Sequence, residues 1–251
     1  MAAREPASRR IQSIDRAVAL LRAVADAPSS PSLAELAEAV SLNRSTAWRL
    51  LLTLEHHGLI DRDAESGRFV LGHEVGRLAQ RGGHGSLVRR GRPALIALSE
   101  QTGMSSVLAA PTPTEPVAID QIDPPGRPEP NMVGWRLPVH ATAAGKLWLS
   151  SLAEPERAEL LRQPLARFTD QTLTDRGALA DQLLEIRRTG IAVDRDEWDP
   201  GWTAVGAPVR DGDAIVAMVS AMATTQRFQG ALLNEVSDQV RRAAAAVAAA
   251  L

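Results

Sequence analysis

The 251-residue sequence contains no cysteine and no tyrosine, and only three phenylalanines. Without cysteine there can be no disulfide, no thiolate nucleophile and no cysteine-ligated zinc or iron–sulfur centre. Histidines remain as possible ligands, but none of the five forms an HxH, HxxxH or HExxH pair. We therefore expect no metal site and no cofactor.

Long apolar runs are also missing. No stretch approaches the roughly 18–20 apolar residues that cross a bilayer, and the start, MAAREPASRR, lacks the apolar segment of a secretory signal. These absences predict a cytoplasmic protein with no membrane partner. Lysine occurs once, at Lys146, which we interpret as codon bias. Because the net charge is −2, any contact with DNA must depend on where the arginines lie rather than on bulk charge.

The N-terminal third of the chain has three short amphipathic segments. The first is predicted to form a helix over residues 13–26, and Ser32 with Glu35 forms a capping box for the second. Asn43 is a suitable N-cap for the third, which we expect to end near Gly58. The run LIDRDAESGRFVLG then predicts a β-hairpin. Three helices and a hairpin are typical of a winged helix-turn-helix domain, here residues 1–72.

The third segment is polar and basic at its start and leucine-rich on its other face. Such a helix enters the DNA major groove with its N-terminal end first. Arginines there can pair with phosphate or guanine, hydroxyls can donate to phosphate, and a tryptophan can contact a thymine methyl. Functionless solvated side chains are the alternative, and Thr46 could instead serve the helix start. The predicted DNA-binding residues, including two in the hairpin, are Arg44, Ser45, Thr46, Trp48, Arg49, Arg62 and Arg68.

The rest of the chain predicts a linker and a second domain. A helical pattern from His73 to Gln80 is broken by RGGHGS, so we expect a linker helix within residues 73–85. Residues 86–251 alternate helical patterns with strand-like runs, including TAVGAPVRDGDAIVAMVSAMA, two strands joined by a DGD turn. This pattern predicts an α+β domain with mostly antiparallel strands.

Six segments of the chain form an ordered set of motifs. In the first domain they are IQSIDRAVALLRAV, SLAELAEAVSLNRSTAWRLLLTLEHHGLI and FVLG. In the second they are LPVHATAAGKLWLS, GIAVDRDEWDPGWTAVGAPV and TQRF. Their order resembles one family, the IclR-type bacterial transcription regulators. The resemblance implies a GAF-like effector-binding and oligomerisation domain. It also implies a homodimer, or a dimer of dimers, on palindromic double-stranded operator DNA.

The resemblance further implies a pocket for a small effector, usually a carboxylate and often aromatic. Met132 is also predicted to contact the effector, because its polarizable side chain beside tryptophan rings could sandwich an aromatic ligand. Asp194 would repel a bare carboxylate unless one of the two groups is protonated, so an amide or phenol donor would suit it better. The predicted effector-binding residues are Met132, Gly134, Trp135, Ala143, Ala144, Asp194, Trp202, Ala204, Ser220 and Met222.

Three positions depart from the family pattern. Ser41 replaces the usual glycine of the helix-helix turn, while Ala204 and Met222 replace more polar residues and make the pocket less polar. The alternative for Trp135, Trp198 and Trp202 is that their rings simply fill the core, and Trp148 is expected to be core.

We expect a ligand-responsive regulator that represses a catabolic or metabolic operon. An enzyme and a protein-interaction module are the two alternatives. AAGK resembles a phosphate-binding loop, but His140 stands at the first glycine position and Leu147 follows Lys146. The acidic residues at 194, 196, 197 and 199 could serve as acid and base, but clustered carboxylates in a turn are usually solvated. Lys146 and His140 could hold a helix start or an interface. A protein-interaction module, with helices at both ends of the second domain as contact surfaces, also remains open. We expect no enzyme activity.

Overall fold

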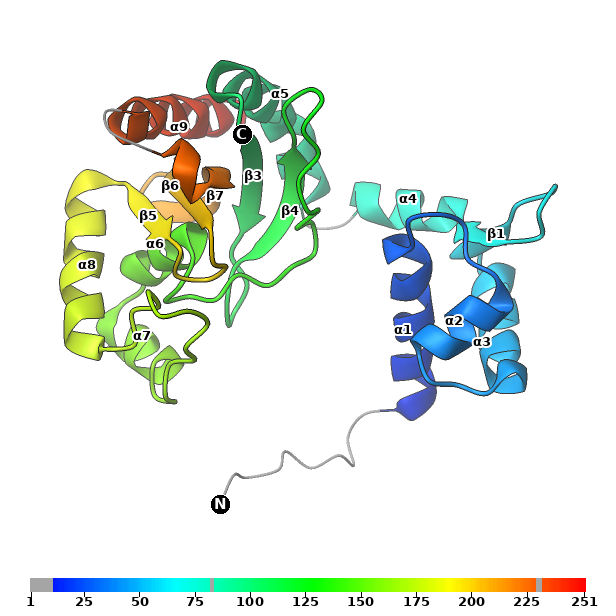
Figure 1. The fold of residues 1–251 in the computed structure, drawn as a ribbon. Helices are drawn as coiled ribbons and strands as arrows, with labels where there is room; N and C mark the ends of the chain where they lie inside the picture. The colour runs from blue at the N-terminus through cyan, green and yellow to red at the C-terminus, as the bar shows by residue number, and fades with distance from the viewer. Residues whose placement is uncertain (1–10, 82–83, 229–231) are drawn as a thin grey trace. The chain divides into compact units, whose positions relative to one another are not determined.

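The computed structural model describes residues 11–81, 84–228 and 232–251. The chain divides into two compact units, residues 1–85 and 86–251 (Figure 1). In the described ranges, no helix has both the length and the apolar character needed to cross a bilayer.

The first unit is a winged helix-turn-helix domain, as the sequence predicted. Its elements are α1 Gln12–Asp26, α2 Leu33–Ala39, α3 Arg44–His56, β1 Ile60–Arg62, β2 Phe69–Leu71 and α4 His73–Arg81. The two strands pair antiparallel as a hairpin. Buried side chains from all three leading helices and from both strands form one core, with Leu20, Leu51 and Phe69 at its centre.

Capping fixes where α2 and α3 begin. The Ser32 side chain accepts the backbone N–H of Glu35, and the Glu35 carboxylate accepts the backbone N–H of Ser32, which confirms the capping box. Asn43 Oδ1 accepts the backbone N–H of Thr46 at 2.8 Å. Gly58 follows the C-cap of α3 with φ +66°, the left-handed conformation that glycine adopts without strain.

Ser41 lies in the turn between α2 and α3, and its φ is +53°. The turn is closed by the backbone N–H of Leu42, which donates to the carbonyl of Ala37 at 2.8 Å. Ser41 therefore occupies a left-handed position that costs an L-residue free energy, as the missing glycine suggested.

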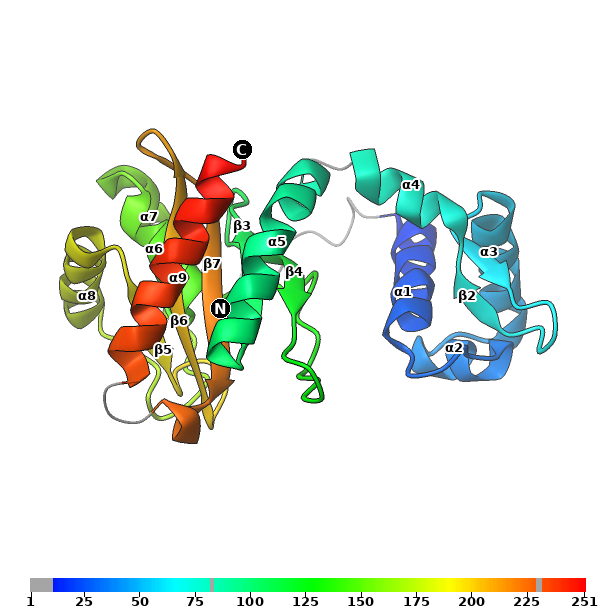
Figure 2. The same cartoon turned by 90° about the horizontal axis from the view of Figure 1, so that it is seen from above.

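The second unit is an antiparallel sheet between two layers of helices. The sheet order is β4-β3-β7-β6-β5. Helices α5 and α9 cover one face, and α6 with α8 covers the other (Figure 2). In chain order the elements are α5 Gly85–Thr102, β3 Ser105–Ala110, β4 Val117–Ile122, α6 Ala143–Ser151, α7 Glu154–Leu160, α8 Arg176–Thr189, β5 Ala192–Arg195, β6 Trp202–Asp211, β7 Ala214–Thr224, the 3₁₀ turn η1 Thr225–Arg227 and α9 Leu232–Ala249.

Strand alternation assigns the residues of β6 and β7 to the two faces. Val205 and Val219 pack in the core under α9, whereas Ala204 and Met222 pack on the side of α6. Gly206 lets α6 approach this second face closely. A Cβ atom at Gly206 would lie 2.9 Å from Ser220 Oγ, 3.0 Å from a Leu147 methyl and 3.4 Å from Ala143 Cβ.

Candidate nucleic-acid interface and effector cavity

The exposed start of α3 carries the candidate DNA contacts. Arg44 and Arg49 are exposed, and neither guanidinium group forms a hydrogen bond or ion pair with any described residue. Ser45 Oγ donates to Asn43 Oδ1 at 2.8 Å, and the Thr46 backbone N–H donates to the same oxygen. The hydroxyl of Ser45 and the backbone N–H of Thr46 therefore serve the helix start in this structure, and the two guanidinium groups are charged donors left uncommitted.

The two hairpin arginines are held within the domain. The Arg62 guanidinium lies over the Trp48 ring, 4.4 Å from its centroid, and donates to Glu55 at 2.9 Å. Arg68 donates to the Ser30 carbonyl at 2.8 Å and to a Glu35 carboxylate oxygen at 3.1 Å. These contacts fasten the hairpin to the helices, and each would have to change before the same guanidinium could bind phosphate.

A cavity of about 410 Å³ opens in the second unit, between the sheet and the start of α6. Its volume falls in the range of small-molecule sites. Every predicted effector-binding residue lines it except Gly134. Gly134 has φ +87° and donates its N–H to the Ala118 carbonyl at 2.8 Å, so it serves a turn beside β4 rather than the cavity wall.

Several further residues line the cavity without having been predicted to do so. The Trp198 ring had been considered with Trp135 and Trp202 as a ligand contact against the alternative of a core position, and Asp199 as a member of the acidic cluster. Of the remaining lining residues, Leu137, Thr142 and Thr203 lie within the quoted motifs, whereas Val107 and Pro130 do not. Thr142 could have been found from the capping signal, because its side chain accepts the Gly145 N–H at the start of α6.

Tryptophan rings form much of the apolar wall. The rings of Trp135 and Trp198 meet edge to face, with centroids 5.9 Å apart and planes at 82°. Trp135 is 50% exposed, so this ring does not fill the core. Trp202 also lines the cavity, whereas Trp148 is 7% exposed and packs in the core under α6, as expected.

Asp194 is the buried acid of the cavity wall, with an exposed fraction of 6%. Its Oδ1 accepts the Glu197 backbone N–H at 3.0 Å. Burial raises the pKa of Asp194 from 3.8 to about 7. The Glu197 N–H and the nearby charge of Lys146 oppose this rise without cancelling it. At neutral pH the carboxyl is therefore poised between its neutral and charged forms.

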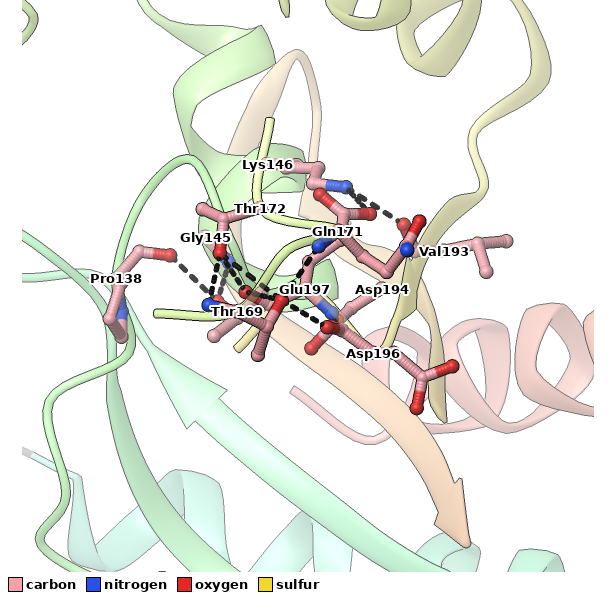
Figure 3. Close-up of polar contacts among 11 residues, drawn as sticks. Pro138, Gly145, Lys146, Thr169, Gln171, Thr172, Val193, Asp194, Asp196 and Glu197 are labelled. Atoms are coloured by element: carbon pink, nitrogen blue, oxygen red, sulfur yellow. Dashed lines mark hydrogen bonds and ion pairs between the residues drawn. The ribbon is translucent and has the colours of Figure 1, made fainter. Parts of the chain in front are cut away.

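Lys146 connects α6 to the loop after β5 (Figure 3). Its fully buried Nζ donates to Glu197 Oε1 at 2.5 Å and to the Val193 carbonyl at 3.0 Å. Thr172 and Thr169 donate to the backbone carbonyls of Glu197 and Asp196, each at 2.6 Å. The loop that follows Asp194 and β5 is thus fixed from two sides.

Two sequence interpretations are wrong here. Asp194 and Glu197 are buried rather than solvated, because the chain places Lys146 and backbone N–H groups against them. Lys146 lies within α6 rather than at a helix start, and it is buried inside the unit. His140 Nε2 lies 2.8 Å from the Ala166 carbonyl and its ring stacks on Phe168, which gives it a structural role. The described residues contain no group of three or more side chains arranged to hold a metal ion.

Together, the helix-turn-helix domain and the separate ligand-sized cavity define a class, the DNA-binding regulators with a ligand-binding domain. Residues 13–64 match the model of the IclR helix-turn-helix domain, and residues 83–249 match that of the bacterial transcriptional regulator IclR C-terminal domain. The chain belongs to the IclR family of bacterial transcriptional regulators. As in that family, the first domain binds DNA and the second binds ligand.

Known relatives cover most of the chain. It is 37% identical to the HTH-type transcriptional regulator Rv1719 of Mycobacterium tuberculosis, over 88% of this chain and 85% of that protein. It is 30% identical to the transcriptional repressor IclR of Escherichia coli, over 82% and 77% respectively. The crystal structure of an IclR homologue from Microbacterium hydrocarbonoxydans complexed with 4-hydroxybenzoate has a TM-score of 0.79 at 23% identity, covering 95% of this chain and 98% of that one. That last likeness shows the fold alone.

Proposed function

We propose that this protein is a repressor of a catabolic or metabolic operon, and that it responds to a small aromatic effector, a carboxylate-like compound or acyl derivative. The cavity supports this proposal, because three tryptophan rings and the side chains of Met132 and Met222 offer apolar surface around a few polar groups. The similarity to a protein named a transcriptional repressor supports repression. The effector would act by binding one arrangement of the protein more tightly than another.

The proposed partner is a palindromic operator bound by a homodimer or a dimer of dimers. A single recognition helix reads only a few base pairs, so specific binding by this motif normally uses two-fold related copies on half-sites about one helical turn, or a multiple, apart. An effector that changes the spacing of two such helices would then control operator binding.

The observation that carries the DNA-binding proposal is the state of Arg44 and Arg49. Both are exposed at the N-terminal part of α3, and neither guanidinium group has a hydrogen-bond or ion-pair partner among the described residues. Ser45, Thr46 and Trp48 lie beside them as secondary candidates, and Arg62 and Arg68 would join only by exchanging their present partners for phosphate.

The experiment compares Arg49→Ala with the wild type on DNA that flanks the gene. We expect Arg49→Ala to weaken specific binding by about 1–3 kcal/mol and to reduce the slope of log affinity against log salt by about one. Arg188→Ala, which removes an exposed arginine of the second domain, is the matched control and should change neither. Unchanged binding by Arg49→Ala would remove this residue from the interface, and wild-type binding without salt dependence would refute the proposed function.

We also propose that the second domain is not catalytic. Its only lysine, Lys146, forms an ion pair with Glu197, and His140 forms a hydrogen bond with the Ala166 carbonyl. A catalytic use of Asp194 or Glu197 would require the carboxyl group to leave its bond to the Glu197 N–H or to Lys146.

A further inference from the structure

The charges on the cavity wall are all of one sign. The lining residues include two carboxylates, Asp194 and Asp199, and no lysine, arginine or histidine among the described residues. Lys146 approaches from behind the wall, but its Nζ is already bound to Glu197 and to Val193. A ligand carboxylate would therefore enter a site without a side-chain cation and next to a buried acid, which disfavours the charged form of one of them.

The cavity nevertheless has hydrogen-bond donors for a ligand. The backbone N–H groups of Ala143 and Ala144, at the first turn of α6, have no partner within the described ranges. Ser220 is 7% exposed, lines the cavity, and its hydroxyl forms no hydrogen bond to any residue that the structure describes. These groups require an acceptor, such as a carbonyl oxygen.

Strand register places these donors near Asp194. Asp194 lies directly opposite Ala204 on the neighbouring strand, and Gly206, two residues further, lies opposite Ser220. A Cβ at Gly206 would touch Ala143 at 3.4 Å, so the start of α6 sits over that point. Two residues of strand correspond to about 7 Å along the sheet, and neighbouring strands are about 4.8 Å apart. Ser220 lies two strands from Asp194, and Ala143 lies over the strand between them, so an acceptor for a ligand N–H and donors for a ligand oxygen line the same face of the cavity.

We infer that the cavity selects an uncharged aromatic carboxamide over the corresponding carboxylate, with the amide N–H directed to Asp194 and the carbonyl oxygen to the start of α6. This inference rests on the proposed function, because it specifies the ligand of the same cavity. The ring would lie among Trp135, Trp198 and Trp202. A carboxamide supplies both a donor and an acceptor in one plane, which a carboxylate does not.

The raised pKa of Asp194 agrees with this choice. The charged groups that act on its carboxyl are Lys146 and Glu197, and Asp199 lines the same cavity. Below about pH 7 the protonated acid can donate a hydrogen bond to a carboxylate, whereas above that pH the ionised acid repels it. Discrimination against a carboxylate should therefore increase with pH.

The test measures calorimetric binding of three matched probes, benzamide, benzoate and benzylamine, to the full-length protein at about pH 8. We expect benzamide to bind at least about 10-fold more tightly than benzoate, because an amide N–H satisfies the acid and a carboxylate leaves it unpaired. Asp194→Asn keeps an oxygen for the Glu197 N–H and can donate to a carboxylate, so the preference should fall to about twofold or reverse. Asp213→Asn, which changes an exposed acid outside the cavity lining, is the control and should retain the preference.

Three results would overturn the inference. They are benzoate binding as tightly as benzamide, benzylamine binding most tightly, or none of the probes binding up to about 10 mM. Each is separate from the proposed function, because operator binding by the ligand-free protein is measured independently. A protein that binds its operator with the expected salt dependence but prefers benzoate would refute only the ligand class.

Discussion

Replacing Asp194 by asparagine should stabilise the second domain, and the gain should grow with pH. Burial raises the pKa of Asp194 from 3.8 to about 7. Between these values the folded state keeps the proton and the unfolded state releases it, so the free energy of unfolding falls as pH rises. A difference of about 3 pH units, at about 1.4 kcal/mol each, corresponds to a loss of about 4 kcal/mol that is complete above about pH 7. Asparagine removes this loss.

The assay follows urea unfolding by tryptophan fluorescence at about pH 5, 6, 7 and 8. A Trp48→Phe background leaves tryptophans only in the second domain, so the signal reports on that domain. The stability advantage of Asp194→Asn should be about 1.5 kcal/mol at about pH 5 and should reach about 4 kcal/mol at about pH 8. Asp199→Asn, an exposed acid, should show no such trend. The reasoning is refuted if the difference does not increase with pH, or if Asp194→Asn is the less stable protein at about pH 8.

Two further changes test other parts of the structure by urea unfolding, the first in the Trp48→Phe background and the second in a chain that keeps Trp48. Lys146→Met should destabilise the second domain by about 3–5 kcal/mol, because Glu197 loses its buried partner, and adding Glu197→Gln should recover part of that loss. A cost for Lys146→Met below about 1 kcal/mol would contradict this role. Ser41→Gly should stabilise the first domain by about 0.5–1 kcal/mol because φ is +53°, whereas Ser13→Gly within α1 should destabilise it, with Trp48 as the reporter. Equal effects of the two glycines would refute the argument from backbone strain.

The sequence predicted those features that depend on neighbouring residues. Ser32 and Asn43 signalled the starts of α2 and α3 through capping, and Gly58 signalled the end of α3. Alternating residues and the DGD turn predicted β6 and β7. Most of the cavity lining came from the family resemblance rather than from periodicity, since no local pattern places Asp194 opposite Ala204.

The failures concern partners that are distant in the sequence. Lys146 and Glu197 are 51 positions apart, so nothing near either residue indicates that the other will neutralise it. Without that pairing, the acidic turn was interpreted as solvated. Arg68 is tied to Ser30, 38 positions away, which a hairpin pattern does not reveal. Such contacts arise only when the elements pack, and local propensity carries no information about them.

Gly206 has only a hydrogen atom as its side chain, and this lets α6 lie close to the sheet beside the cavity. A methyl group at that position would press on Leu147, Ala143 and Ser220. It would push α6 away from the sheet at this point, although Gly206 itself does not line the cavity. Related proteins could thus adapt to larger or smaller ligands by changing a position that does not line the cavity.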